Sequence, residues 1–216
     1  MNEVDDKMDS LKVVVYSDYI WPWCYIGLGR AEQLKRDYGV DLEWKAYELR
    51  PGLPLEGIPR TRRAGEINGF PPYLIERADE FGLKLKRSPI IPCSRPALEV
   101  AEYAKEQGRF DQFHLAVFKA YWEEAKNIGL RSIIREIVEE CGLDADEVEV
   151  CLDENRYTHA IQTQSEEAKL LGITGIPAYV IGGYLVEGVQ PYQLFQRAME
   201  VALHKSKKQS GHNWTT

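Results

Sequence analysis

The fold of this chain is decided by residues 17–27, which read Ser17-Asp18-Tyr19-Ile20-Trp21-Pro22-Trp23-Cys24-Tyr25-Ile26-Gly27. They follow the β-branched run Val13–Val15, which predicts a buried strand over residues 11–17. After them, apolar positions recur with helical spacing and predict a helix over residues 23–38. The stretch is therefore a tight turn from a strand into a helix, with Cys24 in the first helical turn.

Cys24 is the residue of this turn that could carry chemistry. A helix N-terminus has partial positive charge and unpaired backbone N–H groups, so we expect it to favour a thiolate. Thioredoxin-like redox proteins keep a C-x-x-C pair here, in which the first cysteine attacks and the second resolves the mixed disulfide. In this chain Trp21 stands at the first position. Cys24 alone cannot run the two-cysteine cycle, and it could instead be a packed apolar residue.

The composition excludes several classes of function. The chain has 216 residues, of which 44% are hydrophobic, and its net charge is −7 from 27 basic and 34 acidic residues. This charge argues against a nucleic-acid-binding protein, which would show a basic stripe. No window reaches the ~18 apolar residues of a membrane span. The N-terminal residues are polar and lack a signal-peptide core, so we expect a cytoplasmic protein with no membrane partner.

A second strand is predicted over residues 41–48, where Leu42, Trp44 and Ala46 alternate with polar residues. Together with the preceding strand and helix it makes a β-α-β unit, whose two strands should be parallel.

Beyond this unit the pattern changes twice. Residues 51–72 are rich in Pro and Gly and predict a loop, with a short helical piece near 61–66. Helical periodicity then predicts helices over 72–81, 94–107, 110–124, 130–141, 144–153 and 156–171. Strands return at 178–181 and 184–187, joined by the hairpin turn Gly182-Gly183. A last helix is predicted over 191–204.

Without residues 60–156 the order of elements is β-α-β-α-β-β-α, which is the thioredoxin arrangement. We therefore predict an α/β fold of two parts. Residues 11–59 and 157–204 form a thioredoxin-like domain, and residues 60–156 form an inserted all-helical domain. Residues 1–10 and 205–216 are predicted to be flexible tails.

Pro177 begins one of the later strands, where a proline often marks a special backbone. In thioredoxin-like folds this position holds a cis-proline that faces the redox turn. The residue before it, here Ile176, presents its backbone to an extended substrate or to glutathione. We therefore expect a cis bond between Ile176 and Pro177.

Several motifs together carry a resemblance to a known family. They are Ser17-Asp18-x-x-x-Pro22-Trp23-Cys24-Tyr25-Ile26-Gly27, Glu48-Leu49-Arg50-Pro51, Gly172-x-Thr174-Gly175-x-Pro177 and Gly188-Val189-Gln190-Pro191. With them the chain resembles the DsbA-like thiol–disulfide oxidoreductases of the FrnE type over residues 12–202. The resemblance implies a thioredoxin fold with a helical insertion and thiol–disulfide chemistry. Kappa-class glutathione transferases and 2-hydroxychromene-2-carboxylate isomerases are relatives, with a serine at the first cysteine's position.

The chain departs from this family at the site itself, because Trp21 replaces the nucleophilic cysteine. Cys93 lies where the related pattern usually has Asn, at the start of an inserted helix that covers the redox turn in this fold. We hypothesise that Cys93 supplies the missing sulfur and pairs with Cys24. Alternatively, Cys93 lines a pocket or caps the helix without a redox role.

The sequence thus leaves three functions open. The leading prediction is a DsbA-family thiol–disulfide oxidoreductase acting on a protein or small-molecule thiol, with Cys24 and Cys93 catalytic. The second is a glutathione-dependent isomerase or transferase of the kappa type, although Gly188–Pro191 lacks the expected Asp. The third is a redox-inactive binding module. The predicted substrate-binding residues are Trp21, Pro22, Trp23, Ile176 and Pro177. No metal or required cofactor is predicted, glutathione is a candidate substrate or co-substrate, and homodimer formation is left open.

Overall fold

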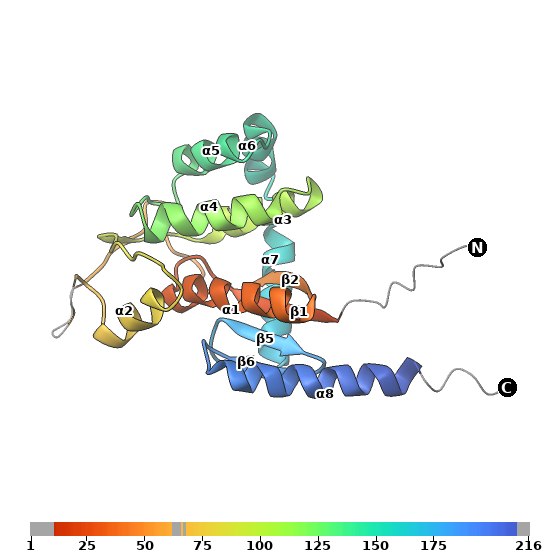
Figure 1. Cartoon of the computed structure of the whole chain (residues 1–216). Coiled ribbons are helices and arrows are strands. Elements are labelled where there is room, and N and C mark those ends of the chain that lie inside the picture. Colours follow the sequence, from red (N-terminus) through yellow and green to blue (C-terminus); the bar gives the residue numbers. More distant parts are fainter. Residues whose placement is uncertain (1–10, 62–65, 67, 211–216) are drawn as a thin grey trace.

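The computed structural model describes residues 11–61, 66 and 68–210. Within these residues, four strands form one mixed sheet in the order β2-β1-β5-β6 (Figure 1). Their bounds are β1 Lys12–Ser17, β2 Asp41–Ala46, β5 Ala178–Ile181 and β6 Tyr184–Glu187. β1 pairs in parallel with β2, as predicted, and antiparallel with β5, which pairs antiparallel with β6. This confirms the α/β thioredoxin-like fold.

Helices cover both faces of this sheet. Successive side chains of β1 point to opposite faces, so each face of the strand packs against a different set of helices. Val13 and Val15 are buried against α1 (Pro22–Tyr38) and α8 (Tyr192–Ser210). Tyr16 belongs to the other buried cluster, together with residues of α7 (Thr158–Leu170). The first helix ends at Gly39 in a left-handed conformation, whose N–H donates to the Lys35 carbonyl.

The segment between β2 and α7 is largely helical. It contains α2 Pro72–Asp79, α3 Arg95–Glu106, α4 Phe110–Trp122, α5 Arg131–Glu140 and α6 Ala145–Asp153. Figure 1 shows α3 to α6 stacked beyond α1 and the sheet, with α2 beside the N-terminal end of α1. One buried cluster joins Cys24 and Tyr25 of α1 to Phe113 and Phe118 of α4. The insertion therefore shares a continuous core with the thioredoxin-like part.

Two predictions differ from the structure, and others fall outside the residues that it describes. The segment also holds two short strands, β3 Ile58–Pro59 and β4 Ile90–Ile91, which pair antiparallel and so make the insertion less than all-helical. Two-residue strands give no periodic signal in a sequence. α8 continues to Ser210, so residues 205–210 are helical rather than a tail. The helical piece near 61–66 and the tails at 1–10 and 211–216 lie outside the described residues, apart from 61 and 66.

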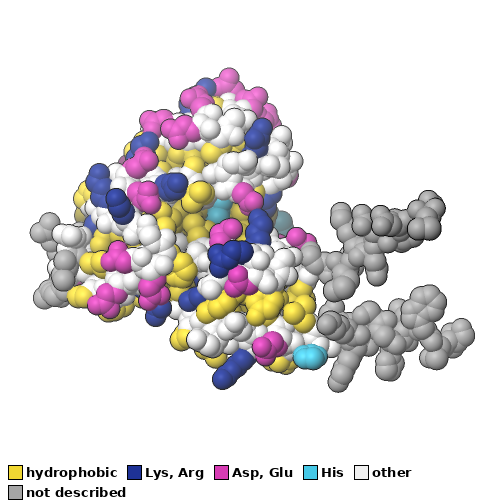
Figure 2. Space-filling model, in the orientation of Figure 1, with side chains coloured by type: hydrophobic (Ala, Val, Ile, Leu, Met, Phe, Trp, Pro, Cys, Tyr) yellow, Lys and Arg dark blue, Asp and Glu magenta, His cyan; other side chains and the backbone are white. Residues whose placement is uncertain are grey.

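Charge is unevenly spread over the surface. Acidic side chains gather over α5 and α6, including Glu139, Glu140, Asp144 and Asp146 (Figure 2). This end of the molecule would repel a phosphate backbone. Of the helices in the described ranges, none combines the length and the apolar character needed to cross a membrane.

Two glycines allow α1 to lie close to its neighbours. A Cβ on Gly27 would come 2.7 Å from the Tyr179 hydroxyl oxygen and 2.9 Å from Cγ of Pro177. The Tyr179 hydroxyl donates to the Gly27 carbonyl at 2.9 Å. A Cβ on Gly29 would come 2.2 Å from the ring of Phe81. Gly27 therefore sets how closely the N-terminal end of α1 approaches the strand that begins after Pro177.

We predict that Gly27→Ala lowers the free energy of unfolding by about 1–3 kcal/mol, because the added methyl overpacks this contact. Alanine would otherwise stabilise a helix by about 1 kcal/mol relative to glycine, so the sign of the change is diagnostic. Urea denaturation measures it. Gly175→Ala is the matched control, since its Cβ would meet nothing within 4 Å, and it should change stability by less than about 0.5 kcal/mol. A Gly27→Ala variant as stable as the wild type would contradict the prediction.

Candidate functional site

A groove lies where the N-terminus of α1 meets the loops before β5 and after β6. Its volume is about 420 Å³, and its lining residues come from α1, from the segment after β2 and from both loops. They are Trp21, Trp23, Leu49, Thr174, Gly175, Ile176, Gly188, Val189 and Gln190. Three predicted substrate-binding residues, Trp21, Trp23 and Ile176, are thus brought together. Pro22 and Pro177 adjoin these residues in the chain but do not line the groove.

The loop before β5 is hydrogen-bonded to Glu187, the last residue of β6. The Ile176–Pro177 bond is cis. The carboxylate of Glu187 accepts hydrogen bonds from the backbone N–H groups of Thr174 at 2.5 Å and Gly175 at 2.8 Å. The Pro177 carbonyl accepts one from Gly188 at 2.7 Å. Within the described part of the chain, no hydrogen bond engages the backbone of Ile176. Its N–H and C=O are therefore available to an extended ligand.

Aromatic side chains form one edge of this groove. Trp21 is the N-cap residue of α1 and 37% of its surface is exposed. The ring of Trp23 stacks on Tyr73 of α2, with centroids 6.0 Å apart and planes inclined by 13°. The exposed indole of Trp21 thus stands three residues before Cys24, where the resemblance leads us to expect a cysteine.

Cys24 lies beneath this surface and none of it is exposed. Burial raises the pKa of its thiol to about 12, although the Asp18 backbone and the Ser17 side chain partly oppose the rise. The expectation that the helix N-terminus favours a thiolate at Cys24 is therefore wrong. The helix end stabilises a nearby negative charge by about 1 kcal/mol. Full burial of a charged group can cost about 4–7 kcal/mol, which raises a thiol pKa by about 3–5.

Cys93 is also buried, and both cysteines are free. Burial raises the pKa of the Cys93 thiol above its usual value. Cys93 is not among the groups that shift the pKa of Cys24, and Cys24 is not among those that shift the pKa of Cys93. The charge of Asp18 raises both pKa values. The pairing of Cys24 with Cys93 stays a prediction, and neither thiol is activated in this structure.

Asp18 is a functional candidate that the sequence analysis missed. Its buried carboxylate accepts hydrogen bonds from the N–H of Leu49 at 2.7 Å, the N–H of Ile20 at 3.2 Å and the hydroxyl of Ser94 at 3.0 Å. It therefore joins the redox turn to the groove wall and to the start of α3. Burial raises its pKa to about 6 despite these three donors. The motif contained Asp18, but only the tertiary structure shows what it contacts.

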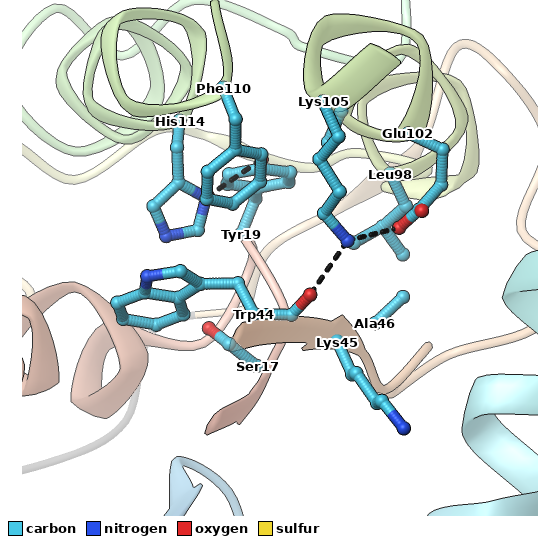
Figure 3. Close-up of a pocket in the computed structure, with 11 residues that line it drawn as sticks. Ser17, Tyr19, Trp44, Lys45, Ala46, Leu98, Glu102, Lys105, Phe110 and His114 are labelled. Atoms are coloured by element: carbon cyan, nitrogen blue, oxygen red, sulfur yellow. Dashed lines mark hydrogen bonds and ion pairs between the residues drawn. The ribbon is translucent and has the colours of Figure 1, made fainter. Parts of the chain in front are cut away.

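A second, smaller cavity lies between β2 and the helices α3 and α4. Figure 3 shows His114 and Phe110 of α4 facing Trp44 of β2, and Lys105 of α3 reaching the Trp44 carbonyl, 2.6 Å away. His114 is buried, bonds to the Tyr19 hydroxyl at 2.9 Å, and has its pKa lowered to about 3 by burial. The cavity measures about 20 Å³, enough for one water molecule. It is too small for a larger ligand, whereas the groove beside Trp21 has room for one and is lined by three of the predicted substrate-binding residues.

Comparison with known protein families identifies the type of protein. The sequence model of the DSBA-like thioredoxin domain matches residues 12–200. The chain belongs to this DsbA-like family. Its relatives include the uncharacterized protein YwbO of Bacillus subtilis, which is 26% identical over 196 residues, or 88% of this chain and 96% of that protein.

Two solved structures resemble it in fold. A probable DsbA oxidoreductase from Streptomyces coelicolor has a TM-score of 0.79 and 26% identity, over 90% of each chain. A 2-hydroxychromene-2-carboxylate isomerase has a TM-score of 0.71 and 21% identity, over 92% of this chain and 98% of the isomerase. The second likeness shows the fold alone.

We predict that ionisation of Asp18 destabilises the protein. Its folded pKa of about 6 exceeds the ordinary value of 3.8, so the native state binds the proton more tightly. The stability that this proton confers is present below about pH 4 and is lost as the pH rises through 6. The difference corresponds to roughly 3 kcal/mol. Urea denaturation across this range should show the wild type losing about this much free energy of unfolding relative to Asp18→Asn as the pH rises.

The exposed carboxylate of Asp79 provides the control for this measurement. Asp79→Asn, which removes an exposed carboxylate, should change the stability by less than about 0.5 kcal/mol. A constant difference between the wild type and Asp18→Asn from about pH 4 to pH 7 would rule out the proposed ionisation.

Proposed function

We propose that this DsbA-family chain binds an extended, uncharged peptide segment in the groove beside Trp21, and that it does not exchange disulfides by itself. One observation carries the proposal: the groove is open and uncharged, while the sulfur beneath it is fully buried. The family's binding surface is thus kept and its nucleophile is replaced.

Cys24 is a poor nucleophile in this setting. Thiol–disulfide exchange proceeds through the thiolate. At neutral pH a thiol with a pKa of about 12 is ionised in roughly one molecule in 100,000. Trp21 supplies no sulfur that could attack in its place. These features support binding without turnover.

The groove's own chemistry indicates the kind of ligand. The backbone of Ile176 can pair with an extended strand, as in other recognition modes that add a strand to a protein backbone. Apolar side chains of Trp21, Leu49 and Val189 line the space around it. None of the described lining residues is charged, so a buried ligand carboxylate would lose its hydration without gaining a partner. An uncharged, apolar peptide therefore fits better than anionic glutathione.

A glutathione-dependent isomerase or transferase is the second candidate. The absence of the first C-x-x-C cysteine favours it, since the isomerase relatives also lack that cysteine, and the isomerase likeness in fold agrees. The uncharged groove disfavours it. The cytoplasmic location and the homodimer stay predictions.

Peptide binding can be measured with insulin B chain whose thiols are blocked by iodoacetamide, using the fluorescence of Trp21 and Trp23. We expect saturable binding. Val189→Glu should weaken it by at least about tenfold, because the carboxylate places a charge in an uncharged groove. Leu170→Glu adds the same charge at a site that is 89% exposed and should leave the affinity unchanged. Binding of glutathione but not of the peptide would instead support the isomerase or transferase.

Restoring the missing sulfur tests why turnover is absent. Trp21→Cys places a thiol at the N-cap of α1, where the helix end lowers thiol pKa values. We expect this variant to accelerate the reduction of insulin by dithiothreitol at least about tenfold over the wild type. Trp21→Ser, which opens the same space without a sulfur, should remain inactive. Acceleration by the wild type, abolished in Cys24→Ser, would overturn the proposal.

A further inference from the structure

Arg30 lies in a box of aromatic rings behind the groove. It follows Trp23 by seven residues on α1, so it lies two turns further along the same side of the helix. Only 6% of its surface is exposed. Its guanidinium carbon lies 5.4 Å from the ring centroid of Phe81, 5.2 Å from that of Tyr192 and 5.5 Å from that of Phe195.

Within the described residues no carboxylate forms an ion pair with Arg30, although the charge of Glu80, itself paired with Arg77, acts on it. Burial lowers the pKa of Arg30, and its Nε has no hydrogen-bond partner in the same part of the chain. Burying a charge without an opposite charge is costly, and an apolar side chain could fill this volume at a lower cost. Core packing alone therefore does not explain an arginine here.

The polar contacts of Arg30 point toward the groove. One terminal nitrogen donates to the side chain of Gln33 at 2.6 Å. The other donates to the backbone carbonyl of Gln190 at 3.1 Å. Gln190 and its neighbours Val189 and Gly188 form one wall of the groove. Arg30 thus connects the helix that carries Trp21 and Trp23 to the opposite loop.

We propose that Arg30 is a positioning residue that fixes the loop 188–191 and so sets the shape of the groove. The effect of Arg30 on ligand affinity rests on the proposed peptide-binding function, whereas its effect on the loop does not. The three rings hold the planar guanidinium by cation–π contacts, and its forked donors reach Gln33 and Gln190 at once. A lysine ammonium has neither the plane nor the fork. Gly29 contributes by leaving room for the Phe81 ring beside α1.

Hydrogen exchange of the backbone tests this role without a ligand. In Arg30→Met, which keeps an unbranched apolar chain, we expect the amides of residues 188–190 to exchange at least about tenfold faster than in the wild type. The amides of Thr174 and Gly175, which Glu187 holds, should exchange at the wild-type rate. Unchanged exchange at 188–190 would overturn the inference whatever the peptide result is. Arg36→Met, at an exposed position of the same helix, is the matched control.

The effect on binding is measured with the blocked insulin B chain. Arg30→Met and Arg30→Lys should each weaken binding at least about tenfold, since both lose the fork that holds the Gln190 carbonyl. The effect should be non-additive with Val189→Ala on the same loop and additive with Leu49→Ala on the other wall. A merely structural role would give additive effects with both.

The two measurements separate the two proposals. Failure of the wild type to bind the peptide, combined with faster exchange at 188–190 in Arg30→Met, would contradict the proposed function and support the role of Arg30. Peptide binding that Arg30→Met leaves unchanged would support the proposed function and contradict the role of Arg30.

Discussion

The buried carboxylate of Asp18 is the constraint on which the site depends. It stands at the end of β1 and accepts hydrogen bonds from the turn, from the groove wall at Leu49 and from Ser94 at the start of α3. One side chain thus links the thioredoxin-like part to the insertion, in addition to the core that the two parts share. The Asp18 carboxyl is fully buried, which strengthens these hydrogen bonds. Burial also makes its negative charge costly, and so raises its pKa to about 6.

Burial decides the chemistry of the neighbouring groups as well. At Cys24 it outweighs the helix N-terminus and the nearby donors, so the thiol stays protonated. At His114 it lowers the pKa to about 3, so the imidazole stays neutral. At Arg30 the aromatic rings offset part of the cost and the charge is retained beside the groove. The site therefore combines a groove without charged lining residues and a buried, protonated thiol.

Much of this architecture could be predicted from the sequence. The apolar run before Ser17, the alternation of Leu42, Trp44 and Ala46, and the turn Gly182-Gly183 correctly indicate a mixed sheet. Trp21, Trp23 and Ile176 were predicted to bind substrate and do line one groove. The pattern could not show β3 and β4, which are too short to be periodic. Nor could it reveal the contacts of Asp18 and Arg30, whose partners lie far away in the chain.

The sequence by itself determined the order of the helices and of the four strands of the main sheet, the turn that carries Cys24 and the absence of a cysteine at position 21. These follow from local periodicity and from residue identity at fixed spacing. Only the tertiary structure decided how deeply Cys24 is buried and which side chains line the groove. A thiol's pKa depends on how completely distant segments exclude water from it, and a groove's selectivity depends on which side chains converge there. Neither property is encoded in the spacing of residues along the chain.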